Sequence, residues 1–410
     1  MKKELAIIGG GPAGLRAAEV ASKAGINTTL FEAKRSVGRK FLIAGKGGLN
    51  LTHAEPLVRF KERYQGPSQP RDFWQGALAG FDNQMIRGWA ARLDVGTFVA
   101  SSGRVYPKAL KAAPLLRAWL KRLKQQGVRF EVRHRLLRIE TGDRFRLHFE
   151  HEGERRLHDF DAVILAMGGG SWPQTGSDGQ WLSILQDLQI DCHPLRSANC
   201  GWEVDWAPEV LEEHEGTPLK NLTARAGDEE ARGELILTRY GLEGGLVYKL
   251  GPSLKKMDEP ILEIDFKPTF TTERLIAKME SAKKNFLKEA RVRWKLSPAA
   301  CAIVEQQAGP FRTADELAQA TKSCRLHLKR PRPIEEAISS SGGVCWPELD
   351  ENLMVRKHPG LFVAGEMIDW EAPTGGYLMQ GCFATGTLVG EASACYLTET
   401  NDALSSRHSS

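Results

Sequence analysis

The stretch that decides the fold is residues 4–32, which read ELAIIGGGPAGLRAAEVASKAGINTTLFE. The apolar run at 5–8 predicts a buried strand, the middle has the composition of a helix, and residues 28–31 predict a second strand. A Gly-x-Gly-x-x-Gly sequence stands at the turn from the first strand into the helix, and the carboxylate of Glu32 ends the second strand. This arrangement predicts a βαβ unit with a dinucleotide site.

The glycines and the acid of this unit have separate physical roles. Gly9 makes the tight turn, Gly11 lets the backbone approach a pyrophosphate, and Gly14 lets the helix pack closely on the sheet. The free N–H groups and the positive dipole end of the helix attract phosphates. Glu32 is placed to accept hydrogen bonds from the ribose hydroxyls. A glycine-rich turn without a ligand is the alternative, but four features in register favour the nucleotide site.

Bulk composition narrows the class of protein. The chain of 410 residues is long enough for two or three domains. Glycines interrupt the N-terminal apolar run, and no later segment has the length of a membrane span, so we expect a cytoplasmic protein with no membrane partner. The seven cysteines include no pair at C-x-x-C spacing. The sequence thus indicates neither a disulfide framework nor a metal site.

Positive charge is concentrated in two blocks, although the net charge is only +5. Residues 104–146 hold 13 Lys/Arg against 3 Asp/Glu, and residues 271–332 hold 14 against 6. Such blocks are typical of solvated helix faces. An anionic partner such as RNA is the other interpretation.

Residues 38–52 follow the βαβ unit and are rich in glycine and cations. We expect no regular helix or strand in 38–48, because glycine weakens both. The functional interpretation is a loop against an anionic ligand, with Arg39 and Lys40 near phosphate and Asn50 and Thr52 as polar contacts. A flexible surface loop is the alternative.

The rest of the chain predicts a domain interrupted by an insertion. Residues 160–170 form an apolar strand that ends in glycines, as expected where the chain returns to a parallel sheet. We therefore expect a discontinuous nucleotide-binding domain, a β-rich inserted domain, a basic helical lid and a disordered tail. Their predicted ranges are 1–190 with 334–400, 191–270, 271–333 and 401–410. Periodicity also predicts helices at 72–95 and 112–126 and strands within 128–139, 145–149, 234–238, 245–248 and 261–266.

A second glycine-flanked element lies near the C-terminus. The strand at 360–364 delivers Gly365 and Glu366 to its carboxyl end, where ligands bind in open α/β sheets. Gly375 and Gly376 then precede another helix start. Paired with the first motif, this element predicts FAD: one end holds the ADP half, and the other holds the ribityl chain and ring.

With these segments together, the chain resembles the YhiN/BaiN-type flavoproteins. The resemblance covers nearly the whole length and rests on segments in the same order. They are 7–14, 38–52, 103–107, 169–177, 238–244, 342–344 and 365–377. It implies an α/β fold, namely a Rossmann-like, glutathione-reductase-like FAD-binding domain with inserted β-barrel-like and helical lid domains. It also implies reduction of conjugated C=C bonds, in a bile-acid enone or in a uracil of ribosomal RNA.

Motifs and resemblance together give a set of predicted FAD contacts. These are Gly9, Gly11, Pro12, Ala13, Gly14, Glu32, Ala33, Arg39, Lys40, Asn50, Leu136, Ala166, Gly168, Gly365, Glu366, Gly375, Gly376 and Tyr377. The family loop commonly reads Gly-Gly-Gly-Arg-Cys-Asn, whereas residues 45–50 here read GKGGLN, so chemistry of that cysteine does not carry over. Residues 238–244 read TRYGLEG where the family commonly has Thr-His-Arg-Gly-Leu-Ser-Gly.

The leading hypothesis is an FAD-dependent oxidoreductase that moves a hydride between flavin N5 and an unsaturated carbon beside a carbonyl, with NAD(P)H as the expected electron donor. Tyr240 and Arg239 are candidate polarisers of the carbonyl, and Glu243 or Cys382 is a candidate proton donor. Cys382 as a small packed residue and Arg239 as a surface charge are the alternatives. Two other hypotheses are an rRNA-modifying, dihydrouridine-forming enzyme that grips RNA with its basic lid, and a non-catalytic flavin-binding or sensing protein.

Overall fold

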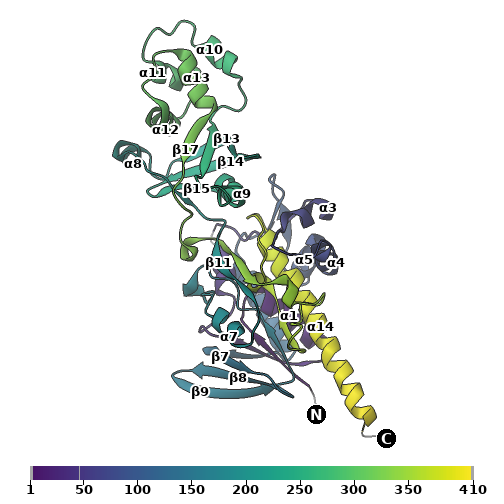
Figure 1. Cartoon of the computed structure of the whole chain (residues 1–410). Coiled ribbons are helices and arrows are strands. Elements are labelled where there is room, and N and C mark those ends of the chain that lie inside the picture. Colours follow the sequence, from purple (N-terminus) through teal and green to yellow (C-terminus); the bar gives the residue numbers. More distant parts are fainter. Residues whose placement is uncertain (1–2, 46, 408–410) are drawn as a thin grey trace. The chain divides into compact units, whose positions relative to one another are not determined.

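A computed structural model describes residues 3–45 and 47–407 of the chain (Figure 1). The chain forms two compact units, one of residues 1–196 with 339–410 and one of residues 197–338. The sequence prediction placed the corresponding boundaries at 190/191 and 333/334. Within the described residues, no helix combines the length and apolar character needed to cross a bilayer.

The first unit is built on a parallel sheet with the order β19-β10-β1-β2-β6 in the part of the chain that the structure describes. Its strands are β1 (Glu4–Ile8), β2 (Asn27–Glu32), β6 (Arg129–Val132), β10 (Ala162–Leu165) and β19 (Leu361–Val363). Leu5 pairs with Ala162 on one side and with Thr28 on the other. The side chains of β1 are buried from Leu5 onward, which is why this strand reads as a continuous apolar run.

Two helices pack closely against each other beside the sheet. Helix α1 (Pro12–Lys23) follows β1, and the long helix α14 (Tyr377–Arg407), yellow in Figure 1, runs along it. A methyl carbon on Gly386 of α14 would lie 2.4 Å from the carbonyl oxygen of Ala13, and one on Gly390 would lie 2.8 Å from Val20 Cβ. These two glycines therefore permit the close approach of the helices.

Smaller elements complete the first unit. A sheet of β3 (Thr52–His53), β5 (Arg104–Pro107) and β4 (Thr97–Val99) adjoins the start of α14, because Gly376 packs on the backbone of Thr52. An antiparallel sheet contains β7 (His134–Glu140), β8 (Phe145–His151) and β9 (Glu154–Phe160), and β11 (Cys192–Ala198) pairs with β18 (Ser339–Val344). The helices of this unit, besides α1 and α14, are α2 (Arg39–Ala44), α3 (Leu57–Phe60), α4 (Phe73–Gly80), α5 (Asn83–Ala91), α6 (Ala112–Gln125) and α7 (Trp181–Asp187).

The second unit has a core of its own, formed by an antiparallel sheet and helices. In the described residues its strand order is β12-β15-β14-β13-β16-β17, with β12 (Trp202–Glu203), β13 (Pro218–Ala226), β14 (Glu229–Thr238), β15 (Gly241–Glu243), β16 (Ile261–Asp265) and β17 (Cys324–His327). Its helices are α8 (Pro208–His214), α9 (Gly245–Leu254), α10 (Thr272–Lys278), α11 (Phe286–Arg293), α12 (Pro298–Ala308) and α13 (Ala314–Lys322). Strand β17 follows the basic helices and pairs with β16, so the stretches predicted as separate β-rich and helical domains share one sheet.

The structure corrects several predicted elements. Residues 39–44 form helix α2, because the glycines of this stretch lie before and after the helix and leave its interior free of them. The helix predicted at 72–95 is two helices, since the Asp82 carboxylate caps a new N-terminus by accepting from the backbone N–H groups of Gln84 and Met85.

Two further predictions fail at the ends of longer helical stretches. Residues 245–248 begin helix α9 and are not a strand, because Leu246, Leu250 and Leu254 recur with helical spacing and are buried together. Helix α14 continues to Arg407, where the sequence predicted a disordered tail from residue 401; residues 408–410 of that predicted tail lie outside the described residues.

A buried carboxylate ties α1 to the helices around it. The Oε2 atom of Glu19 accepts hydrogen bonds from the indole N–H groups of Trp89, at 2.9 Å, and Trp119, at 3.0 Å. The Glu19 carboxylate also pairs with Arg16 at 3.1 Å and with Arg122 at 3.2 Å. Because Glu19 is only 5% exposed, its charge depends on these four donors for solvation.

Replacement of Glu19 by alanine is therefore expected to reduce the free energy of unfolding by about 3–5 kcal/mol, the cost of leaving buried partners unpaired. The free energy of unfolding is measured by urea titration with tryptophan fluorescence as the signal. The control is Glu154→Ala, which breaks an exposed pair with Arg156 and should cost at most about 1 kcal/mol. Equal losses in the two variants would contradict this account of the Glu19 cluster.

Candidate functional site

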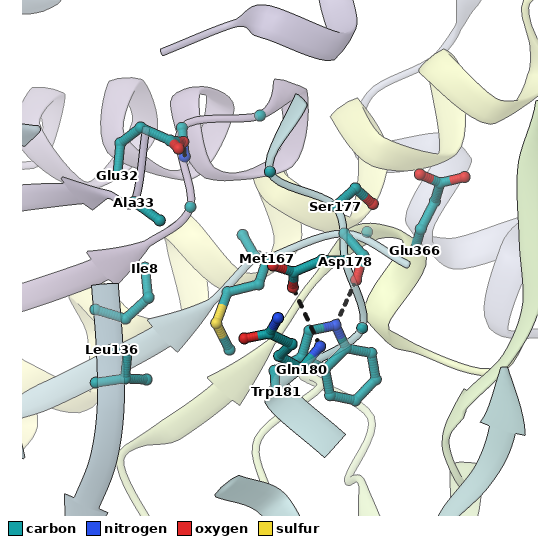
Figure 2. A pocket seen from close by; sticks show the side chains of 18 of the residues that line it. Ile8, Glu32, Ala33, Leu136, Met167, Ser177, Asp178, Gln180, Trp181 and Glu366 are labelled. Atoms are coloured by element: carbon teal, nitrogen blue, oxygen red, sulfur yellow. Dashed lines mark hydrogen bonds between the residues drawn. The ribbon is translucent and has the colours of Figure 1, made fainter. Parts of the chain in front are cut away.

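A cavity of about 550 Å³ lies at the carboxyl edge of the parallel sheet. Each of the parallel strands contributes the residues that directly follow it. They are Gly9–Ala13 after β1, Glu32 and Ala33 at the end of β2, 134–137 after β6, 166–168 after β10, and 364–366 after β19. Figure 2 shows Glu32 and Glu366 on opposite sides of the cavity in that view, with Met167 and Trp181 between them. The site therefore follows from sheet topology, because parallel strands end at one edge.

The three glycines of the first turn differ in whether neighbouring protein atoms leave room for a side chain. A methyl carbon on Gly9 would lie 2.3 Å from the carbonyl oxygen of Ala166, and one on Gly14 would lie 2.0 Å from the carbonyl oxygen of Gly9. Gly9 also has a φ of +110°, which disfavours other residues. At Gly11, no protein atom lies within 4 Å of the position that a methyl carbon would take. The protein itself thus gives no steric reason for glycine at Gly11, and the free space belongs to the cavity.

Glu32 is held rigidly at the end of β2. Its Oε2 accepts from the backbone N–H of Gly10 at 2.9 Å, and its Oε1 accepts from that of Lys34 at 2.8 Å. Burial raises the pKa of the Glu32 carboxyl, and the hydrogen bonds from Lys34 and Gly10 oppose this rise. A carboxylate in this position can accept the hydroxyl groups of a ribose.

A second wall of the cavity was missed by the sequence analysis. Residues 175–184 line it opposite 134–137, and the Arg135 guanidinium donates to Gln180 Oε1 across the two walls at 3.0 Å. The backbone N–H of Gln180 bonds to Asp178, and the indole N–H of Trp181 donates to the carbonyl oxygen of Gly168 at 2.8 Å, as the dashed lines in Figure 2 mark. The sequence of the loop 170–180 has no periodicity that predicts its contact with the cavity.

A charged cluster closes the other end of the cavity. The Lys40 ammonium donates to Ser171 Oγ at 2.7 Å and to Glu366 Oε2 at 2.8 Å. Cys382, on the second turn of α14, also lines the cavity, and its Sγ would lie 3.7 Å from a methyl carbon on Gly365. Burial, aided by the nearby Glu366 charge, raises the pKa of the Cys382 thiol, which keeps it protonated at neutral pH.

The structure brings together most of the predicted FAD contacts, although binding by each of them stays a prediction. Thirteen predicted site residues line the cavity: Gly9, Gly11, Pro12, Ala13, Glu32, Ala33, Lys40, Leu136, Ala166, Gly168, Gly365, Glu366 and Cys382. Gly14 supports the turn from behind. Arg39, Asn50, Gly375, Gly376 and Tyr377 are not part of the lining, and the Tyr377 hydroxyl donates to Glu55 at 2.7 Å.

The remaining catalytic candidates belong to the second unit. The Tyr240 hydroxyl donates to Glu243, and the guanidinium of Arg332 lies 4.4 Å from the centre of the Tyr240 ring. Burial and the Glu243 carboxylate raise the pKa of Tyr240. The Arg239 guanidinium pairs with Glu215 on the surface. A role for Tyr240, Arg239 or Glu243 in catalysis stays a prediction.

Comparison with known proteins identifies the family. The chain belongs to the family described as HI0933-like protein Rossmann domain, which matches residues 3–392. It is 26% identical to a 3-dehydro-bile acid delta(4,6)-reductase of Clostridium scindens, over 95% of this chain and 98% of that protein. It is 23% identical to a ribosomal RNA dihydrouridine synthase of Escherichia coli, over 92% of this chain and 95% of that protein.

Solved structures of two ketosteroid dehydrogenases share the fold. A 3-ketosteroid delta1-dehydrogenase from Sterolibacterium denitrificans superposes with a TM-score of 0.54 and 12% identity, covering 95% of this chain and 99% of the other. A 3-ketosteroid-delta4-(5alpha)-dehydrogenase from Rhodococcus jostii superposes with a TM-score of 0.52 and 16% identity, covering 96% of this chain and 97% of the other. With the family, these comparisons establish a Rossmann-type FAD-dependent oxidoreductase. They leave no support for the alternative of a non-catalytic flavin protein.

The residues present fit FAD. The open space at Gly11 suits a pyrophosphate, and the fixed Glu32 carboxylate suits a ribose. The buried Nε of Arg39 and Oδ1 of Asn50 have no partner in the described part of the chain, but neither residue lines the cavity. Within the same residues, no group of His, Cys, Asp and Glu is arranged to hold a metal ion.

The geometry at Gly11 predicts that Gly11→Ala leaves the fold intact and blocks the cofactor. We expect the apoprotein of the variant to melt within about 2 °C of the wild type, because the added methyl meets no protein atom, while FAD affinity falls at least about tenfold. Thermal melts and FAD titration measure both. The control is Gly76→Ala, on exposed turns of α4, where a methyl is equally unhindered and FAD affinity should not change.

The raised pKa of Glu32 predicts a pH-dependent FAD affinity. Ribose hydroxyls favour the ionised carboxylate, so binding must lower a pKa that burial holds above 4.5 in the apoprotein. FAD affinity should therefore rise with pH from about 4.5 and become constant once apo Glu32 is ionised. Glu32→Gln should bind more weakly and lose this dependence. An unchanged slope in the variant would assign the proton to another group.

Proposed function

We propose that the protein reduces a C=C bond conjugated with a carbonyl group. The observation that carries the proposal is similarity over nearly the full length of both chains to the bile-acid reductase, together with a cavity whose ends suit the two halves of FAD. When bound, FAD supplies the hydride chemistry. The donor that reduces it is proposed to be NAD(P)H.

The residues of this chain supply binding, orientation and electrostatics. The α1 turn and Glu32 would hold the ADP half, while Lys40, held by Ser171 and Glu366, would present its ammonium at the opposite end of the cavity. The Glu366 carboxylate balances the Lys40 charge, so this pair would offer the flavin hydrogen bonds without a net charge. The protonated Cys382 thiol on the cavity wall is the proposed source of the proton that completes reduction of the substrate.

A second candidate substrate is a uracil in RNA. The similarity to a ribosomal RNA dihydrouridine synthase favours it, and so does the basic block 271–332 of the second unit. The chemistry is the same, because the C5=C6 bond of uracil is conjugated with a carbonyl. A base in RNA would have to leave its stack to reach a flavin, and the basic block would bind the flanking phosphates.

Anaerobic turnover separates these substrates. Reduced enzyme is mixed with a 3-oxo-4-ene steroid or with protein-free ribosomal RNA, and flavin reoxidation is followed by absorbance. We expect reoxidation with one of the two and a product heavier by two hydrogen atoms in mass spectrometry. Gly11→Ala protein without FAD is the control. Oxidation of the flavin by oxygen alone, with neither compound reduced, would contradict the proposal.

A further inference from the structure

The 103–107 motif, GRVYP, has no role in the site described so far. Its arginine lies on β5, where Arg104 pairs with His53 of β3. A methyl carbon on Gly375 would lie 3.8 Å from Arg104 Nε and 3.4 Å from the Tyr377 ring. The Arg104 side chain therefore lies at the turn that begins α14.

This turn is close to the end of the cofactor cavity. Tyr377 begins α14, and Cys382, which lines the cavity, follows five residues later. Five residues of helix span about 7.5 Å. Arg104 thus lies just beyond the end of the cavity marked by Lys40, Glu366 and Cys382, opposite the end at Glu32 where the ribose is proposed.

The Arg104 side chain is partly buried and has no protein acceptor in the described residues. Within this part of the chain it takes part in no hydrogen bond or ion pair, whereas Arg63 and Arg122 of the same unit each pair with a carboxylate. Glu55, the carboxylate bound to the neighbouring Tyr377 hydroxyl, also accepts two bonds from Arg63, at 2.9 and 2.8 Å. Glu55 is therefore already engaged.

An unpartnered acceptor adjoins the same strand. The Oδ1 atom of Asn50 is buried without a hydrogen bond in the described structure, and the next residue, Leu51, donates its N–H to the carbonyl oxygen of Val105 at 2.9 Å. Arg104 on β5 and Asn50 in the loop before β3 thus each carry a polar group without a partner in the described residues, and the partly exposed guanidinium is the one that a ligand can reach.

We propose that Arg104 binds the carbonyl oxygen of the substrate. The inference rests on the proposed function and names the residue that polarises the conjugated bond. When a hydride adds to the β-carbon, the C=C electron pair would move to form an enolate, and Arg104 would stabilise the negative charge on the enolate oxygen. A proton then adds to the α-carbon and restores the carbonyl.

Phenolates test this role without turnover, because a phenolate oxygen resembles an enolate oxygen. Oxidised holoenzyme is titrated with para-substituted phenols, and binding is read from the change in flavin absorbance. Arg104→Ala should weaken phenolate binding about tenfold to a hundredfold, as expected for one charge-assisted hydrogen bond. Arg104→Lys, which keeps the charge without the planar fork, should lie between the wild type and Arg104→Ala.

The same variants are then tested with the reducible substrate. Arg104→Ala should lower the rate of flavin reoxidation by the substrate about a hundredfold or more. Its FAD affinity and melting temperature should equal those of the exposed control Arg117→Ala. Loss of FAD affinity in parallel with phenolate binding would place Arg104 on the cofactor and overturn the proposal.

Two further results distinguish failure of the role proposed for Arg104 from failure of the proposed function. If wild type and Arg104→Ala reduce the substrate equally well, Arg104 has no part in catalysis while the proposed function stands. If wild type binds no phenolate and reduces neither enone nor uracil, the proposed function itself fails, and the role of Arg104 fails with it.

Discussion

The whole site depends on the contact between two strand ends. Gly9 and Ala166 follow adjacent parallel strands, and their backbones approach so closely that no side chain fits between them. This contact fixes the start of α1, so it also fixes the open space at Gly11 and the direction of the free N–H groups of the helix. Gly386 of α14 then packs on Ala13, which brings the C-terminal helix to the same edge. One steric constraint thus aligns residues that are far apart in sequence.

The two ends of the cavity have different electrostatic characters. At one end Glu32 is a buried carboxylate whose charge burial disfavours, which suits a partner that donates hydrogen bonds. At the other end Lys40 neutralises Glu366, and Arg104 adds a cation without a counter-ion in the described residues. A ligand that donates hydroxyls at one end and accumulates negative charge at the other is complementary to both. Reduced FAD with an enolate beside it has these properties.

The sequence predicted the parts of the site that depend on local chain geometry. The turn at Gly9–Gly14, the acid at Glu32 and the pair Gly365–Glu366 could be found because strand, glycine and acid occur in a fixed order. The wall at 175–184 was not assigned to the cavity, although its start lies in the 169–177 motif, because this loop and the first turn of α7 reach the cavity only through tertiary packing. Helix α9 was mistaken for a strand because a short apolar run has no clear period. The 103–107 motif contains Arg104, but the sequence could not show that this arginine lacks a partner, since only the fold shows which carboxylates are already paired.

The division of the first unit between the two ends of the chain has a consequence for biosynthesis. Residues 364–366 and Cys382 line the cavity, yet they are translated after the whole of the second unit. A nascent chain on the ribosome has made β1, β2, β6 and β10 but lacks β19 and α14 until the whole inserted unit has been made. The β10 edge of the sheet therefore stays unpaired with β19 while the inserted unit is synthesised. A complete cofactor cavity therefore forms only after the inserted unit has been synthesised.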